Sequence, residues 1–416
     1  MFAFEMVECE SACWRVGVAH EDFPVKDMWG WFKTMQMGEP PPWAVLMAGG
    51  KSELQKAYNY DTKKDKLGEG NFAEVFKATL SKPRTAEKLG EPIPDTVAIK
   101  VIDKKLLLPS LLNMEVYAMQ RCSGHPNIAA LLAAFALPPD EASPDGEWHL
   151  VMELAEGGEL FERLLEHGAY TEKVASQLLR QVAKAVYHLH SVGICHRDVK
   201  PENVVLTSKA PDSPVKLIDF GAAVLLEEGE QVIAGGKVGT WTYWAPEQAD
   251  AAKAYDQAVD MWSVGVLLYI MLSGRHPFER PAASRRAAGD DGTAAVMDNI
   301  LAANYSFDSA QWNGISGRAR KLVTQLLEPD PDKRLTAAQL LAHSWVRGED
   351  VPERPLPETV ERLRAFNQAR RTWAAAIRAA ALVASAPVAA AHHSATGTLS
   401  DEARAELREA FDGLDV

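Results

Sequence analysis

The pattern of apolar and polar residues predicts a long amphipathic helix near the middle of the chain, over residues 171–190. Within it the apolar residues recur at steps of three or four positions: Val174, Leu178, Val182, Val186 and Leu189. This spacing puts them on one face of a helix. Thr171 is a plausible N-cap, because its hydroxyl can accept a hydrogen bond from a backbone N–H of the first turn. The helix leads into a polar run that begins at His196, and we expect it to hold that run rigidly.

Two other apolar segments predict buried elements. The residues just before Lys100 are apolar and mostly β-branched, which is typical of a buried strand. Residues 261–272 are mostly apolar but fall short of the ~20 residues needed to cross a bilayer, so they predict a buried helix. No other apolar run approaches that length, and we expect no transmembrane segment.

Several stretches between these elements predict loops. Residues 81–95, 138–146 and 280–292 are rich in proline, alanine or charged residues, and we interpret them as insertions at the surface. Residues 1–59 contain a run of three prolines and several tryptophans but no clear period. We assign them no fold and expect an irregular N-terminal extension, with a docking segment as the alternative.

Charge and cysteine content narrow the class of protein. The chain has 416 residues, of which 47% are apolar, so it can hold more than one lobe with its own core. Its net charge of −13 argues against nucleic acid as a partner and fits the attraction of basic peptides. The four scattered cysteines indicate a reducing compartment. Since the N-terminus lacks the basic start of a signal peptide, we expect a cytoplasmic protein, with the nucleus as a further compartment.

The densest chemistry lies in residues 196–203, His-Arg-Asp-Val-Lys-Pro-Glu-Asn, and in Asp219-Phe220-Gly221. Phosphoryl transfer requires mainly that charges and metal ions be placed correctly, and this set can place them. Asp198 can accept the proton of a substrate hydroxyl, and Lys200 can stabilise the moving phosphoryl group. Asn203 and Asp219 offer the hard oxygen ligands that Mg²⁺ prefers.

The order of motifs along the chain resembles that of the protein kinases. The glycine-rich loop would be Leu67-Gly68-Glu69-Gly70-Asn71-Phe72-Ala73-Glu74-Val75, and the third strand Val97-Ala98-Ile99-Lys100. Ala245-Pro246-Glu247 resembles the end of the activation segment. The resemblance covers roughly residues 60–346. It implies an α+β, bilobal protein kinase fold with a small β-rich N-lobe over 60–153, a larger helical C-lobe over 156–346, and C-terminal regulatory helices.

The resemblance also implies that ATP binds with Mg²⁺ between the lobes. The backbone of the glycine-rich loop would lie over the phosphates, although Ala73 stands where the family has a third glycine. Lys100 would position the phosphates with Glu115 as its ion-pair partner. Leu111 and Met119 share a helix face with Glu115, and an unpaired charge on that apolar face would be costly. The hinge at the adenine would be Met152, Glu153 and Ala155, and the apolar residues around the base Val75, Ala98, Met152 and Val205, for which simple core packing is the alternative.

Other matches imply the class of substrate. Thr240, expected near the catalytic acid, and Lys200 favour Ser or Thr over Tyr as the phosphate acceptor. Glu159 and Glu202 match positions that meet arginines upstream of the target residue in basophilic kinases. Solvent-exposed acids without that role are the alternative. The remaining matches imply structural roles: Asp260 as an anchor of the catalytic loop, and Glu247 with Arg334 as a buried ion pair.

The activation segment lacks the usual site of activating phosphorylation. Between Ala222 and Gly239 there is no Ser, Thr or Tyr. The segment instead carries three acids: Glu227, Glu228 and Glu230. We hypothesise that one of these carboxylates pairs with Arg197 in place of a phosphate.

Residues 356–392 resemble the autoinhibitory and calmodulin-binding junction of calcium-regulated kinases. Residues 362–378 form a basic amphipathic pattern with aromatic anchors, a common design of calmodulin targets. The expected contact spans residues 362–382, and a plain solvent-exposed helix is the alternative. Residues 397–416 resemble the first helix of an EF-hand pair with only one loop ligand, Asp415, so we expect no calcium site there. The chain would then be a fragment of a longer calcium-dependent kinase or a kinase that has lost its sensor.

These observations favour an ATP-dependent serine/threonine protein kinase linked to calcium signalling. Two other interpretations stay open. One is a pseudokinase or scaffold, which Ala73 and the insertions favour slightly, although every catalytic and metal-binding position is filled. The other is a calmodulin-binding module whose kinase domain is secondary.

Overall fold

The computed structural model describes most of the chain between Lys51 and Ser385. The described residues are 51–69, 73–81, 95–105, 107, 109–139, 143–166, 170–210, 212–226, 229–232, 238–279, 293–308 and 310–385. Residues 1–50, the EF-hand-like residues 397–416 and most of the expected insertions 81–95 and 280–292 lie outside them. The third expected insertion, 138–146, connects two strands of the N-lobe.

The N-lobe is built on one antiparallel sheet of six strands. The strands lie in the order β1, β3, β4, β6 and β5, and β2 pairs with β3. Their bounds are β1 Tyr58–Asn59, β2 Lys66–Glu69, β3 Ala73–Leu80, β4 Thr96–Asp103, β5 Leu131–Leu137 and β6 Glu147–Glu153. In the described part of the chain, two helices complete this lobe: α2 Lys51–Ala57 and α3 Pro109–Arg121. The strand predicted before Lys100 is therefore β4, at the centre of the sheet.

The strand register separates the two faces of this sheet. Ile99 lies opposite Val151, and both are buried on the outer face with Leu54 of α2. One residue further along β4, Lys100 lies opposite Val75 on β3 and Leu150 on β6. Since successive side chains of a strand alternate between faces, Lys100 points to the inner face, toward the C-lobe.

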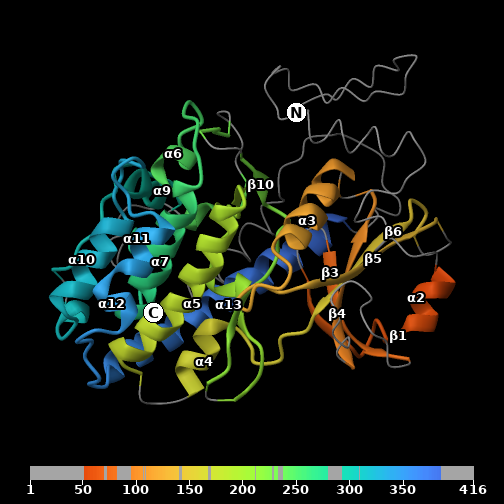
Figure 1. Ribbon diagram of the computed structural model, residues 1–416, viewed down its shortest axis with the longest axis horizontal. Coiled ribbons are helices and arrows are strands. Elements are labelled where there is room, and N and C mark those ends of the chain that lie inside the picture. The colour runs from red at the N-terminus through yellow and green to blue at the C-terminus, as the bar shows by residue number, and fades with distance from the viewer. Residues whose placement is uncertain are drawn as a thin grey trace.

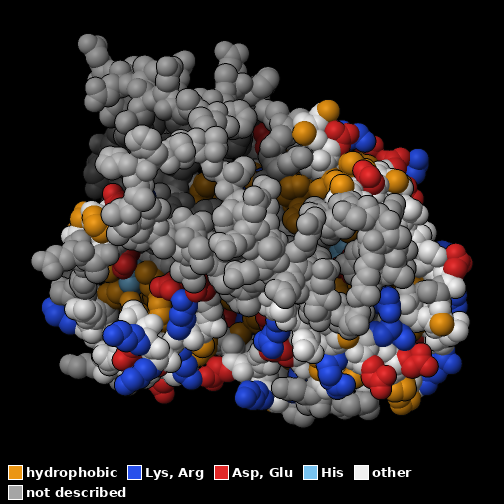
Figure 2. All heavy atoms as spheres, turned by 180° about the vertical axis from the view of Figure 1, so that it is seen from behind, with side chains coloured by type: hydrophobic (Ala, Val, Ile, Leu, Met, Phe, Trp, Pro, Cys, Tyr) orange, Lys and Arg blue, Asp and Glu red, His pale blue; other side chains and the backbone are white. Residues whose placement is uncertain are grey.

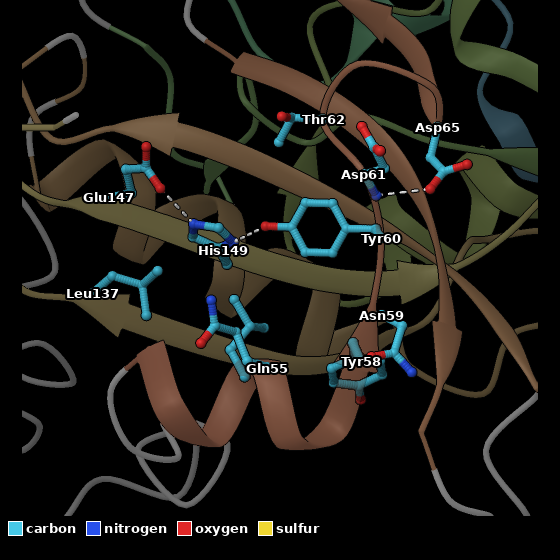
Figure 3. A pocket seen from close by; sticks show the side chains of 11 residues that line it. Gln55, Tyr58, Asn59, Tyr60, Asp61, Thr62, Asp65, Leu137, Glu147 and His149 are labelled. Atoms are coloured by element: carbon cyan, nitrogen blue, oxygen red, sulfur yellow. Dashed lines mark hydrogen bonds and ion pairs between the residues drawn. The ribbon is translucent and has the colours of Figure 1, made fainter.

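Residues 51–59, for which the sequence predicted no fold, form α2, which packs on the outer face of the sheet, and β1, which pairs with β3. A chain of hydrogen bonds then joins the following loop to β6. The Tyr60 hydroxyl lies 3.3 Å from Nδ1 of His149, and Nε2 of His149 lies 2.8 Å from Glu147 (Figure 3). Burial, with Glu147 nearby, raises the pKa of Tyr60 to about 12. An open cavity of about 710 Å³ lies beside these residues, between α2 and the start of β6 (Figure 3).

The C-lobe is mainly helical and forms the left half of the molecule in Figure 1, with the sheet on the right. Its helices are α4 Leu160–Glu166, α5 Glu172–Ser191, α6 Pro246–Ala249, α7 Ala258–Ser273, α9 Thr293–Leu301, α10 Gly317–Leu326, α11 Ala337–Ala342, α12 Ser344–Arg347 and α13 Pro357–Ser385. Two short strand pairs lie near the lobe junction: β7 Ile194–Cys195 with β10 Val224–Leu225, and β8 Val204–Leu206 with β9 Val215–Leu217. Single 3₁₀ turns occupy Pro201–Asn203, Trp241–Tyr243 and Ala310–Trp312.

Helix α5 confirms the amphipathic helix predicted over residues 171–190. The Thr171 hydroxyl accepts the backbone N–H of Val174 at 3.3 Å, as expected of an N-cap. The predicted apolar face is buried in the large core from Leu178 onward. The helix ends at Ser191 and β7 follows, so a rigid element leads directly to His196.

Helix α7 is the buried helix predicted over residues 261–272. Every residue from Val259 to Ser273 is buried. The ring of Trp262 stacks on Phe278 with centroids 5.5 Å apart. Gly274 ends the helix in the left-handed conformation, with φ of 72°. Among the described residues, no helix is both long and apolar enough to cross a membrane.

Helix α3 differs from its prediction at one residue. Leu112, Glu115, Val116 and Met119 form its buried stripe, whereas Leu111 is 48% exposed. Four residues exceed one helical turn by about 40° of rotation, so the predicted row of Leu111, Glu115 and Met119 drifts around the helix. The first turn therefore leaves Leu111 in solvent while Glu115 stays inside.

The surface seen in Figure 2 carries charges of both signs. Among its described residues, lysine and arginine side chains lie next to aspartate and glutamate side chains along the lower edge, rather than in one basic stripe.

Candidate catalytic site

The backbone of the catalytic loop is held in place by one buried acid, Asp260 of α7. Its carboxylate accepts the backbone N–H groups of His196 at 2.9 Å and of Arg197 at 2.8 Å. His190 lies 2.9 Å from the same carboxylate. Burial alone would raise the pKa of Asp260, but the hydrogen bond from His190 and the nearby histidines outweigh it and lower the pKa. The predicted role of Asp260 as an anchor is confirmed, and it holds Arg197 in a left-handed conformation with φ of 64°.

Asp198 lies at the centre of a group of hydrogen-bond donors. Its Oδ1 accepts the backbone N–H of Thr240 at 2.8 Å. Its Oδ2 lies 2.7 Å from Nζ of Lys200 and 2.9 Å from Nδ2 of Asn203. Nζ of Lys200 also donates to the hydroxyl of Thr240 at 2.7 Å. The structure thus brings together the four residues that the sequence proposed as catalytic.

Gly239 makes the approach of Thr240 possible. Its φ is 88°, and a Cβ there would lie 2.2 Å from the carbonyl oxygen of Arg197. No side chain fits at that distance, so glycine is required between the activation segment and the catalytic loop.

Lys100 sits between two carboxylates on the inner face of the sheet. Its Nζ lies 2.5 Å from Glu115 of α3 and 2.9 Å from Asp219. Burial alone would lower the pKa of Lys100, but the attraction of Glu115 and then Asp219 outweighs it and raises the pKa. The charge of Lys100 lowers the pKa of Asp219 to about 2. Burial raises the pKa of Glu115, and Lys100 opposes that effect. The predicted pair of Lys100 and Glu115 is confirmed, and both lysine and Asp219 carry charge at neutral pH.

Three of the predicted adenine-facing residues, Val75, Ala98 and Met152, share one face of the N-lobe sheet. Ala98 lies opposite Met152 in the register of β4 and β6. Val75 lies opposite Lys100 on the neighbouring strand, and therefore on the same face. Val205 comes from β8 of the C-lobe and pairs with Glu159 across a β-bridge. The register thus supports a surface of small and apolar side chains between the lobes.

Several side chains of the predicted hinge and glycine-rich loop form ion pairs within the protein. Glu153 forms an ion pair with Lys216 at 2.7 Å, so its side chain supports the hinge, and it is followed by the half-buried Ala155. In the loop, Leu67, Gly68 and Glu69 belong to β2, and Ala73, Glu74 and Val75 to β3. The carboxylates of Glu69 and Glu74 both meet Lys66, at 2.8 and 2.5 Å. Gly70, Asn71 and Phe72 lie outside the described residues.

The predicted buried ion pair of the C-lobe is confirmed. Nη1 and Nη2 of Arg334 lie 2.6 and 3.0 Å from the two carboxylate oxygens of Glu247. The guanidinium also lies over the ring of Trp262, 5.1 Å from its centroid. Both charged residues are almost fully buried. This pair fixes the end of the activation segment to the helical core.

Two sets of contacts were not predicted from the sequence. Arg197 donates from Nε to the carbonyl of Ala222 at 2.6 Å and from Nη1 to the hydroxyl of Tyr255 at 3.3 Å. Glu227 and Glu228, two of the acids expected near Arg197, lie outside the described residues. Tyr255 belongs to no sequence motif, so no local signal could have indicated it.

The second set involves helix α13, which passes behind α5 (Figure 1). Arg370 forms ion pairs with both Glu159 and Glu202. The next residue, Arg371, pairs with Glu162 of α4. The acids predicted to meet substrate arginines are thus occupied by an arginine of the same chain.

Apolar contacts hold α13 in this position. Leu363 is fully buried in the large core, and Phe366 packs edge to face on Phe161 of α4, with centroids 6.1 Å apart. At the start of the helix, the hydroxyl of Thr359 donates to the carbonyl of Leu272 at 3.1 Å. Within the part of the predicted pattern whose side chains are described, residues 362–372, the apolar residues Leu363 and Phe366 therefore pack against the C-lobe.

The arrangement as a whole suits phosphoryl transfer to a hydroxyl. The carboxyl group of Asp198 is surrounded by the amine of Lys200, the amide of Asn203 and a backbone N–H. On the inner face of the sheet, Lys100 lies next to a second acid, Asp219. Such a reaction depends on placing charge and metal around a terminal phosphate rather than on covalent chemistry by the protein.

The fold and these motifs define a protein kinase. Residues 61–346 match the family described as protein kinase domain, and the chain belongs to the protein kinase family. It is 39% identical over 318 residues to calcium/calmodulin-dependent protein kinase type 1B of Rattus norvegicus, which covers 76% of this chain and 83% of that protein. The type IV enzyme of the same species is 37% identical over 350 residues, 84% of this chain and 67% of that protein. Calcium-dependent protein kinase 15 of Oryza sativa subsp. japonica is 36% identical over 356 residues, 84% of this chain and 57% of that protein. The chain is a protein serine/threonine kinase of the calcium-signalling group.

Proposed function

We propose that this kinase transfers the γ-phosphoryl group of ATP, bound with Mg²⁺, to serine or threonine in proteins with basic residues near the target. The observation that carries this proposal is the placement of Asp198 between Lys200, Thr240 and Asn203. Asp198 accepts the proton of the substrate hydroxyl or orients it. Lys200 stabilises the charge of the transferred group, and the Thr240 backbone keeps Asp198 in place.

Asn203 and Asp219 are the residues that would hold Mg²⁺. Asn203 donates from Nδ2 to the carbonyl and the carboxylate of Asp198, so its amide oxygen faces the other way. Asp219 remains ionised at neutral pH because its pKa is about 2. An amide oxygen and an ionised carboxylate match the preference of Mg²⁺ for hard oxygen ligands. When bound, the ion would neutralise charge on the phosphates, while Lys100 positions them.

The substrate preference follows from Glu159 and Glu202. Arg370 pairs with both carboxylates, which supports a site of the right size and charge for a guanidinium. Burial alone would lower the pKa of Arg370, but Glu202 and Glu159 outweigh it and raise the pKa. A peptide with an arginine upstream of its serine or threonine would make the same contacts.

Helix α13 then acts as an inhibitory segment, because it occupies the acids that the substrate needs. We place the calmodulin contact on residues 362–382, within the junction 356–392. The apolar side of this segment, at Leu363 and Phe366, is buried against the C-lobe. Calmodulin could bind that side only by displacing the helix, which would free Glu159 and Glu202 for substrate. We expect this to occur in the cytoplasm.

Replacement of the proposed base tests the reaction. In a radiolabelled ATP assay with a basic serine peptide, Asp198→Asn should lower kcat by roughly 10²–10⁴-fold, because proton-accepting groups contribute about that much. Asp332→Asn, an exposed acid of the C-lobe, serves as the matched control and should keep full activity. Equal activity of the Asp198 variant and the wild type would contradict the assignment. Absence of phosphate transfer by the wild type, even with calcium and calmodulin, would favour the scaffold interpretation.

A further inference from the structure

The side chain of Arg197 connects three parts of the C-lobe. Its backbone belongs to the catalytic loop, one residue before Asp198. Its Nε donates to the carbonyl of Ala222, directly after Asp219-Phe220-Gly221, at 2.6 Å. Its Nη1 lies 3.3 Å from the hydroxyl of Tyr255, which follows α6. A half-buried guanidinium needs such acceptors, since a charge left without partners away from water is costly.

Tyr255 is tied to the activation segment through its backbone as well. The N–H of Val232 donates to the carbonyl of Tyr255 at 2.7 Å, and the N–H of Tyr255 donates to the carbonyl of Val232 at 3.1 Å. These two bonds form an isolated antiparallel bridge. Tyr255 therefore holds the middle of the activation segment by its backbone and Arg197 by its side chain.

The sequence of the activation segment indicates a role for this arrangement. No residue between Ala222 and Gly239 has a hydroxyl that a kinase could phosphorylate. A phosphate in that segment would otherwise order it by binding an arginine. We propose that Tyr255 is a positioning residue that replaces this phosphate: with the carbonyl of Ala222 it holds Arg197, and so keeps Asp198 and the activation segment in their catalytic arrangement.

The chemistry of the tyrosine agrees with this role. Burial raises the pKa of Tyr255, and the charge of Arg197 opposes that effect without reversing it. The hydroxyl is therefore neutral at physiological pH, and its oxygen accepts a hydrogen bond from the guanidinium of Arg197. It follows that the enzyme needs no activating phosphorylation in this segment. The inference rests on the proposed catalytic role of Asp198.

Tyr255→Phe in the full chain tests the proposal, because it removes only the hydroxyl. We expect kcat to fall about 10-fold, the effect of losing one hydrogen bond to a charged group, while the KM for ATP stays unchanged. In an Arg197→Ala background the same substitution should cause no further loss, since the partner is gone. Phosphatase treatment should leave the wild type fully active. Tyr187→Phe, at an exposed tyrosine of α5, is the matched control.

A readout that does not depend on activity separates this proposal from the proposed function. Backbone hydrogen exchange around residues 222–226 and Arg197 should become faster in Tyr255→Phe and stay unchanged in Tyr187→Phe. An unchanged kcat, an equal loss with and without Arg197, unchanged exchange, or inactivation of the wild type by phosphatase would each overturn the role of Tyr255. Full activity of Asp198→Asn would instead overturn the catalytic assignment of Asp198. The hydrogen-exchange measurement would then still test whether Tyr255 holds Arg197 and the activation segment.

Discussion

At the scale of single residues, the behaviour of this protein depends on charged groups placed next to a partner. Lys100 keeps its charge in a buried position because Glu115 and Asp219 both lie within hydrogen-bond distance. Asp219 keeps its charge because Lys100 is adjacent. Each of these groups would otherwise lose its charge or destabilise the fold. The charge states of Lys100 and Asp219 at neutral pH are therefore set by pairs and not by single side chains.

His125 is a half-buried group that loses its charge instead of keeping it, and this predicts how the stability of the fold depends on pH. Its Nδ1 accepts the backbone N–H of Asn127 at 3.2 Å, and its ring stacks on His188 with centroids 4.7 Å apart. Burial and then the neighbouring His188 lower the pKa of His125 to about 4, from an ordinary value of 6.5. The folded state thus binds fewer protons than the unfolded state between these two values. The stabilisation is complete above pH 6.5 and is lost as the pH falls toward 4.

We therefore expect His125→Asn to flatten the loss of stability on the acid side. Urea unfolding midpoints of the wild type should fall between pH 7 and pH 4.5 more steeply than those of the variant. If both proteins lose stability in parallel over this range, His125 does not titrate as the structure indicates.

At the scale of elements, helix α13 is the part whose position we propose to control the access of substrate. It packs against α4 and α7, and its basic residues form ion pairs with Glu162 of α4, with Glu159 just before α4 and with Glu202 of the catalytic loop. The contacts combine buried apolar groups with ion pairs near the surface. Such a helix can be displaced without unfolding the lobe, because it lies on the core and forms little of its centre.

Removal of one arginine should loosen this helix. Arg370→Ala breaks two ion pairs at once, and we expect the basal activity toward a basic peptide to rise about 5- to 20-fold in the absence of calmodulin. The exposed Arg364, on the same helix, offers a control: Arg364→Ala removes the same charge and should leave the basal activity unchanged. Equal basal activities of the wild type and both variants would show that α13 does not inhibit.

At the scale of the whole molecule, the helices of the C-lobe and the activation segment are held by buried polar links across long stretches of chain. Glu247, at the end of the activation segment, and Arg334, after α10, lie 87 residues apart and still form two hydrogen bonds. Glu172 at the start of α5 accepts from Ser316 and from Trp345 in the same way. These links join helices that apolar packing alone would leave free to slide.

Loss of one partner should therefore destabilise the entire C-lobe. Glu247→Gln leaves the buried guanidinium of Arg334 without its counter-charge, and we expect a loss of about 3–5 kcal/mol in the free energy of unfolding. The exposed Glu353 is the comparison, because Glu353→Gln should change stability by less than ~0.5 kcal/mol. Urea unfolding followed by circular dichroism measures both. A loss below 1 kcal/mol in Glu247→Gln would mean that the pair is dispensable.

The sequence by itself determined several elements and the grouping of the candidate catalytic residues. Thr171 and the apolar period after it fixed α5, and the run from His196 to Asn203 fixed the acid, the amine and the amide within one loop. These features depend on neighbours a few residues away, and such local spacing can be read directly from a sequence. Leu111 marks the limit, because a small rotation at a helix end decides between core and solvent.

Only the tertiary structure decided which distant groups meet. Arg370 pairs with Glu159 from 211 residues away, and Arg197 meets the hydroxyl of Tyr255. Residues 51–59 form a helix on the outer face of the sheet and a strand paired with β3, and both contacts exist only once the sheet has folded. In each case the folded backbone determines which group becomes the partner. A charged or apolar side chain could pair with many complementary groups, and its local sequence does not specify which one it will contact.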